Sequence, residues 1–192
     1  MSNIIKAYNT LKVADFTIVN QGTKTITDIG NKISITGAST SGYSWCFLTK
    51  SLPTAPYIVE TYVENLSVWS SYLMQGLALY DSASGKSVTF SIMTNGAVYS
   101  CKLLVQTNSS VTTNVGVIYS NGVENWGINW LRIVDDNTNW KFQASTDGIN
   151  WVTQYSTARN TYCTPNTVGL SVCAYSQALA TTFSHFKVIT SG

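Results

Sequence analysis

The sequence predicts an all-β fold of antiparallel strands, arranged as a two-sheet sandwich or a barrel. Three observations support this prediction. Short runs in which apolar and polar residues alternate recur along the 192-residue chain, as in strands with one buried face. Turn-forming pairs such as Asn-Gly and Asp-Gly stand between these runs. Apolar residues at helical spacing are almost absent, so no long helix is expected.

The clearest alternation lies in Ser87-Val-Thr-Phe-Ser-Ile-Met. Successive strand side chains point to opposite faces, so Val88, Phe90 and Ile92 share one face and hydroxyl groups cover the other. The same pattern predicts further strands near Phe16–Val19, Lys24–Ile29, Lys32–Thr36, Tyr43–Leu48, Tyr57–Glu64, Met74–Tyr80, Val98–Val105, Val115–Tyr119, Trp130–Val134, Thr167–Tyr175 and Phe183–Ile189.

Hairpin turns are predicted where the alternation stops. Asp81-Ser-Ala-Ser-Gly-Lys joins two of the predicted strands. The pairs at 95–96, 121–122 and 147–148 tolerate the positive φ angles of tight turns. In Ser145–Trp151 we expect Asp147 to cap backbone amides, Gly148 to make the turn and Trp151 to pack back.

Composition limits the classes of partner. Charged residues make up 10% of the chain, well below the usual value of about 25%. The net charge is +2 without a basic run, so no nucleic-acid partner is expected. No stretch approaches the roughly 18 consecutive apolar residues of a membrane-spanning helix, so we expect no membrane insertion. The surface should be rich in hydroxyls and amides, which suits sugars or protein neighbours.

The first residues show no apolar signal-peptide core. We therefore expect synthesis in a cytoplasm, with export only as part of an assembly. Residues 1–15 carry Ile4, Ile5, Tyr8, Leu11 and Val13, too many apolar groups for a free tail. This stretch is predicted to be either a first strand with its entry loop or an arm that docks onto a neighbour. Residues 16–192 then form the sandwich domain.

None of the four cysteines, Cys46, Cys101, Cys163 and Cys173, forms a CxxC pair, so a zinc site is not expected. Three of them lie inside apolar or alternating runs, where a free thiol behaves as a small hydrophobic group. A disulfide between Cys163 and Cys173 remains the alternative.

Three parts of the chain, in this order and spacing, resemble the concanavalin A-like lectin/glucanase superfamily and its small laminin G-like and DUF1349-type domains. They are Gln75–Lys86 with Val88–Phe90; Trp130–Asp136 with Phe142–Trp151; and Val168–Val172 with Phe183–Val188. The resemblance covers roughly residues 40 to 190. It implies a jelly-roll sandwich of two curved antiparallel sheets.

Catalysis is not expected. Glycoside hydrolysis needs two carboxylates across the scissile bond, and the acidic cluster of glucanases in this superfamily has no counterpart among the 9 acidic residues. Glu60 and Glu64 share a strand face and should be solvated surface charges. Asp135 and Asp136 should sit in a strand-end turn, with a calcium site as the minor alternative. The single histidine, His185, should be structural, and no cofactor or metal is expected.

Sugar binding is harder to dismiss. An aromatic ring offers a flat apolar surface to a pyranose and usually carries a polar handle. Trp45, Trp140 and Trp151 should belong to the core. Trp69, Tyr72 and Trp126 lie in polar or glycine-containing segments and are the candidate ligand-binding residues. The alternative is that these three cover the end of the core.

The function expected from these observations is that of a non-catalytic virion protein of a bacteriophage, namely a head-decoration, fibre or tail adhesin domain. The length of the chain and its sequence pattern resemble those of phage structural proteins, which is an argument by analogy. Its partners would be capsid or tail proteins, further copies of itself as a homo-oligomer, and host-surface glycans. The alternative is a carbohydrate-binding module or lectin that acts outside a virion.

Overall fold

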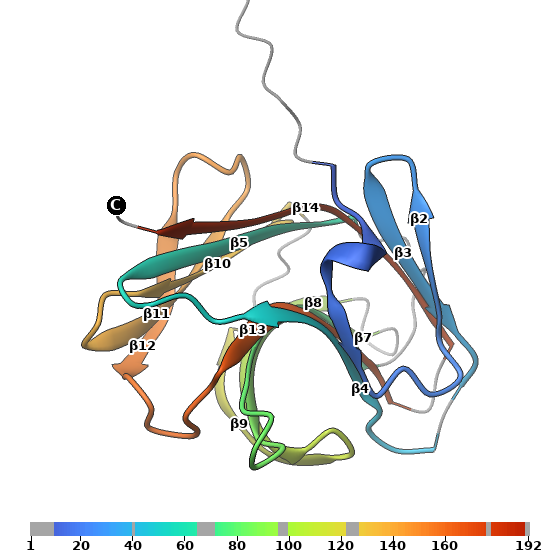
Figure 1. Ribbon diagram of the computed structural model, residues 1–192, viewed down its shortest axis with the longest axis horizontal. Helices are drawn as coiled ribbons and strands as arrows, with labels where there is room; N and C mark the ends of the chain where they lie inside the picture. The colour runs from blue at the N-terminus through green and yellow to red at the C-terminus, as the bar shows by residue number, and fades with distance from the viewer. Residues whose placement is uncertain are drawn as a thin grey trace, which may run out of the picture.

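The computed structural model describes residues 10–39, 41–64, 72–95, 100–121, 127–175 and 178–190, excluding the side chains of residues 95, 100, 101 and 115. Within them, fourteen strands form two antiparallel sheets of seven strands each (Figure 1). A single 3-10 turn, η1 (Val13–Asp15), precedes the first strand. None of the described segments is a helix that could cross a membrane.

Sheet A has the strand order β1-β4-β13-β6-β7-β8-β9. Its strands are β1 (Thr17–Val19), β4 (Trp45–Ser51), β13 (Thr167–Ala174), β6 (Leu73–Tyr80), β7 (Ser87–Asn95), β8 (Ser100–Ser110) and β9 (Thr113–Asn121).

Sheet B has the strand order β12-β11-β10-β5-β14-β3-β2. Its strands are β12 (Val152–Ala158), β11 (Asn139–Ser145), β10 (Trp130–Asp135), β5 (Tyr57–Glu64), β14 (Leu179–Thr190), β3 (Lys32–Gly37) and β2 (Thr25–Ile29). In Figure 1, β14, β5 and β10 form an upper layer over β13, β8 and β9.

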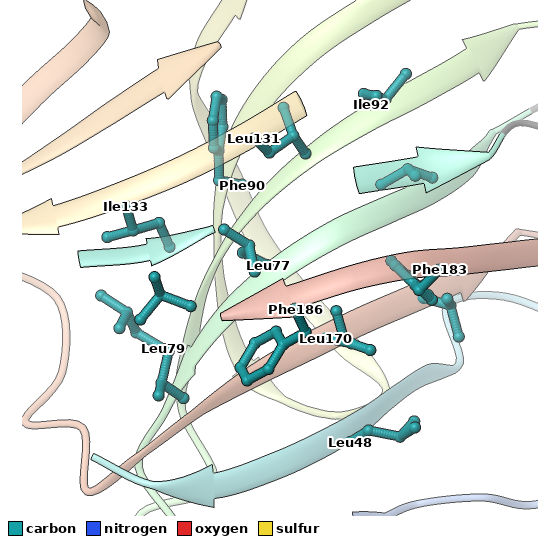
Figure 2. Packing of buried hydrophobic residues seen from close by; sticks show 14 of the residues in the cluster. Leu48, Leu77, Leu79, Phe90, Ile92, Leu131, Ile133, Leu170, Phe183 and Phe186 are labelled. Atoms are coloured by element: carbon teal, nitrogen blue, oxygen red, sulfur yellow. The ribbon is translucent and has the colours of Figure 1, made fainter. Parts of the chain in front are cut away.

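The main core fills the space between the sheets. Its apolar residues come from alternate positions of each strand, for example Leu77 and Leu79 on β6 and Leu131 and Ile133 on β10 (Figure 2). Phe90 of sheet A meets Phe142 of sheet B at a ring-centroid distance of 5.6 Å. Burial of these side chains is the main force that holds the two sheets together.

Sheet A curls so strongly that its outer face is also buried. The backbone N–H of Trp45 donates to the carbonyl of Val111, in the turn between β8 and β9, at 2.9 Å. A second apolar cluster fills the curl and includes Trp45, Phe47 and Tyr80. Gly169 permits the close strand contact, because a Cβ there would collide with the carbonyl oxygen of Leu48.

The predicted fold class is confirmed, and a strand overlaps each of the twelve predicted runs. The predicted runs do not include β11 and β12, although the hairpin turn that joins them was predicted. No residue of the edge strand β12 is buried, so its sequence lacks the alternation that marks a half-buried strand. Trp45 and Trp140 are fully buried, as expected for core residues.

The cysteines whose side chains are described are buried free thiols, as predicted, so Cys163 and Cys173 do not pair. Burial raises the pKa of Cys46 to about 11 and that of Cys173 to about 12, which keeps both thiols protonated at neutral pH. Of the N-terminal stretch, only residues 10–15 are described, and Leu11 in this segment is buried in the main core.

Candidate functional site

The outer face of sheet B carries an ordered grid of side chains on its three central strands, β14, β5 and β10. On β5, Val59, Thr61 and Val63 point inward, so the residues that alternate with them, Ile58, Glu60, Tyr62 and Glu64, point outward. The strand register aligns the outward residues of the three strands in rows. From β14 to β10, these are an aromatic row (His185, Tyr62, Trp130), a charged row (Lys187, Glu60, Arg132) and an aliphatic row (Ile189, Ile58, Val134).

The rings of the aromatic row pack edge to face. The centroids of Tyr62 and Trp130 are 5.0 Å apart, and those of Trp130 and His185 are 5.1 Å apart. Above them lies a pocket of about 460 Å³, which we call the aromatic pocket. Its lining consists of Asn31, Lys32, Tyr62, Trp130, Ser184 and His185. The pocket therefore combines flat apolar rings with hydroxyl, amide, ammonium and imidazole groups.

A β-bulge in β14 shapes one side of this pocket. Phe183 pairs with Val63 and His185 pairs with Tyr62, so Ser184 is an extra residue without its own partner on β5. As a result, Ser184 and His185 both line the pocket. On the same side, Lys32 donates to Glu64 at 2.6 Å, which holds the lysine side chain beside the pocket.

The hairpin between β11 and β12 supports the opposite side. The backbone N–H groups of Ile149 and Asn150 both donate to Asp147 Oδ1 at 2.8 Å, as the turn prediction required. These hydrogen bonds favour the ionised carboxylate and hold the pKa of Asp147 well below its usual range. Gly148 adopts a φ of +72° and lies against the Trp130 ring, which restricts the position of that ring.

Glu60 and Arg132 of the charged row belong to a network of side-chain contacts on this face. Arg132 Nη2 donates to Glu60 Oε2 at 2.8 Å, and His185 Nε2 lies 3.3 Å from Glu60 Oε1. The Arg132 guanidinium also stacks 3.8 Å from the centroid of the Trp151 ring. Hydrogen bonding by His185 and Arg132 lowers the pKa of Glu60, against the opposing effect of its burial.

Two expectations for this face need correction. Glu60 was expected to be a solvated surface charge, but its side chain is only 13% exposed, because Arg132 and His185 cover it. Trp151 was expected in the core, but it is half-buried and its ring stacks against the Arg132 guanidinium. The side chain of His185, which was expected to be structural, is 31% exposed and contacts Glu60.

Of the three ligand-binding residues predicted from the sequence, only Tyr72 is described, and it does not line this pocket. Trp69 and Trp126 fall outside the described residues, so their assignment stays a prediction. Tyr72 is 44% exposed and makes an edge contact with Tyr175 at a centroid distance of 5.9 Å. Tyr43 packs 4.9 Å from Tyr175, so these three rings form a patch beside the start of β6.

The aromatic pocket was missed, although part of its signal is present in the sequence. Strand alternation already places Tyr62 opposite Val63 and Trp130 opposite Leu131, which predicts outward rings. Nothing in the sequence shows that β10 and β14 both pair with β5. In the part of the chain that the structure describes, no three His, Cys, Asp or Glu side chains gather in a way that could hold a metal ion.

The sequence matches no protein-family model and no curated protein. Solved structures share the fold over most of the chain. A functionally unknown protein from Saccharomyces cerevisiae superposes with a TM-score of 0.68 at 14% identity, over 94% of this chain and 99% of its own. A legume lectin-like domain from Entamoeba histolytica superposes with a TM-score of 0.61 at 13% identity, over 94% of this chain and 92% of its own.

A third similar structure is the GH43 protein BlXynB from Bacillus licheniformis, with a TM-score of 0.67 at 12% identity. The match covers 96% of this chain but only 38% of BlXynB, so the chain corresponds to a minor part of that protein. At such identities the similarity concerns the fold alone. The fold is that of the lectin-like jelly-roll sandwiches, in agreement with the resemblance to the concanavalin A-like superfamily.

Proposed function

We propose that this protein is a non-catalytic glycan-binding protein and that its ligand occupies the aromatic pocket on sheet B. The observation that carries this proposal is the composition of the pocket, in which Trp130 and Tyr62 lie beside Asn31, Ser184 and other polar groups. The apolar face of a sugar ring packs well on an aromatic ring, and its hydroxyl groups need hydrogen-bond partners at the rim. The lectin-like fold adds support.

The electrostatics of the pocket favour binding over hydrolysis. A glycosidase needs two carboxyl groups across the bond, one of them protonated by a raised pKa. Glu60 and Glu64, the carboxylates that contact His185 and Lys32 of the pocket lining, are each held in an ion pair. The pKa of Glu60 is lowered, which is opposite to what a general acid requires. We therefore assign the protein no catalytic activity.

For the biological setting, we propose the bacteriophage virion, with the protein as a head-decoration, fibre or tail adhesin domain made in the host cytoplasm. The weakly charged, hydroxyl-rich composition is the support for this part of the proposal. Co-purification with phage particles and a defined homo-oligomer would favour it. A monomer that binds glycans but never associates with particles would favour the alternative of a lectin outside a virion.

The glycan site is tested on a glycan array with the wild-type protein, Trp130→Ala and Tyr72→Ala. We expect Trp130→Ala to lose binding and Tyr72→Ala to keep it. Loss in Tyr72→Ala alone would move the site to the tyrosine patch. Absence of binding by the wild-type protein at high concentration would contradict the proposed function. Circular dichroism of both variants controls for misfolding.

A further inference from the structure

We propose that the ligand is a linear oligosaccharide that lies along β5 and reaches from the aromatic row to the aliphatic row. This inference rests on the proposed function and adds the length and direction of the ligand. It starts from a second hollow on the outer face of sheet B. That hollow has a volume of about 280 Å³ and is lined by Pro56, Tyr57, Ile58, Val134, Asp135, Asp136, Ile189 and Thr190.

The two hollows lie at opposite ends of β5 and of β10, and at the middle and the end of β14. The aromatic pocket contains Tyr62 of β5, and the second hollow contains Ile58 of the same strand. Four residues of strand separate these positions, which corresponds to about 13 Å. This length exceeds a single sugar ring, so one monosaccharide does not contact both hollows. The aliphatic row is a contiguous apolar surface, since Ile58 pairs with both Val134 and Ile189.

Glu60 and Arg132 of the charged row form a low floor between the hollows. The side chains of Glu60 and Arg132 are 13% and 19% exposed, because they bind each other and Arg132 stacks on Trp151. They therefore lie close to the sheet and do not separate the hollows as a wall would. Lys187 in the same row is exposed. A chain of sugars that crosses this row meets charged groups that bind hydroxyls and keeps an apolar contact at each end.

The outer face of sheet A does not offer such a surface. The backbone of Val111 is hydrogen-bonded to Trp45 and closes the curl of this sheet, and aromatic side chains fill the space inside the curl. Among the described residues, the broad sheet face left open is that of sheet B. A ligand longer than one sugar is therefore expected along β5.

The test uses a series of oligosaccharides of increasing length, built on the glycan that the array identifies. Wild-type affinity should rise with chain length until both hollows are filled. Val134→Lys places a charge in the aliphatic row and should weaken the longest ligand about tenfold while leaving the shortest unchanged. Ile189→Lys should do the same if Val134→Lys folds poorly. Val117→Lys, at an exposed valine of sheet A, is the matched control.

Each outcome separates this inference from the proposed function. If Trp130→Ala abolishes binding but both lysine variants match the wild-type protein at every length, the extended site is wrong and the aromatic pocket stands. A wild-type affinity that does not change with the length of the oligosaccharide would lead to the same conclusion. If the wild-type protein binds no glycan, both proposals fail. A homo-oligomer that dissociates in Val134→Lys, without length-dependent glycan binding, would identify this face as a self-association surface and overturn the inference.

Discussion

Gly148 lies against the indole ring of Trp130, so close that a Cβ at this position would come within 2.8 Å of the ring atom Cε2. A turn of the β11–β12 hairpin therefore helps to position the tryptophan ring of the proposed glycan site. Glycine is needed at this position for two reasons. The turn requires a positive φ, and the Trp130 ring leaves no room for a side chain. Substitutions at Gly148 should consequently affect both stability and binding.

We predict that Gly148→Ala weakens glycan binding and destabilises the fold more than Gly30→Ala does. Both glycines have positive φ, but a Cβ at Gly30 would meet nothing within 4 Å. Backbone strain alone should cost about 1 kcal/mol in Gly30→Ala, and the collision with Trp130 should add about 1–3 kcal/mol in Gly148→Ala. Urea unfolding measures both values. Equal losses in the two variants would show that the ring contact contributes nothing.

We predict that Glu60 and Arg132 stabilise each other by about 1–2 kcal/mol, because most of their ion pair is shielded from water. A double-mutant cycle with Glu60→Gln and Arg132→Met measures this coupling. The pair Lys32–Glu64 is the control, since its side chains are 44% and 27% exposed and its coupling should stay below about 1 kcal/mol. A coupling no larger than that of the control would contradict the prediction.

Stability should be lost as the pH falls through the acid range. The pKa values of Glu60, Asp81, Asp136 and Asp147 are all lowered in the folded protein, that of Asp136 to about 2. A lowered pKa stabilises the folded state above the ordinary pKa of the group, and this contribution disappears as protons bind. Since the ordinary values are 4.5 for Glu and 3.8 for Asp, the loss should begin near pH 4.5 and continue to about pH 2.

Urea midpoints recorded at a series of pH values test this dependence. Asp136→Asn removes one of the titrating groups, so its midpoint should fall less steeply in the acid range than that of the wild-type protein. A wild-type midpoint that stays constant from pH 4.5 to pH 2 would contradict the prediction.

The curl of sheet A should depend on Gly169. We predict that Gly169→Ala destabilises the protein by about 3 kcal/mol or more, because the added methyl group collides with backbone and β4 cannot yield without breaking its pairing. Gly116→Ala is the control within the same sheet, since a Cβ there would meet nothing within 4 Å. Thermal unfolding compares the two variants. A melting temperature of Gly169→Ala equal to that of Gly116→Ala would show that β4 moves freely.

Strand positions could be predicted because alternation is a local property of the chain. Val88, Phe90 and Ile92 are buried as their spacing required, and the Asp147 turn forms with the expected amide hydrogen bonds. The strand β12 was missed because both of its faces are partly exposed, so its sequence shows little alternation between apolar and polar residues. Which strands become neighbours was not predictable, since pairing depends on contacts between distant segments.

The sequence by itself determined the all-β class, the strand and turn positions and the inward or outward side of most residues, because each follows from the period-two geometry of strands. Only the tertiary structure decided that Tyr62, Trp130 and His185 share one pocket. His185 and Glu60, which lie 3.3 Å apart in that site, are separated by 125 positions in the chain. Sheet register and the bulge at Ser184 bring them together, and both result from packing the whole sandwich around one core.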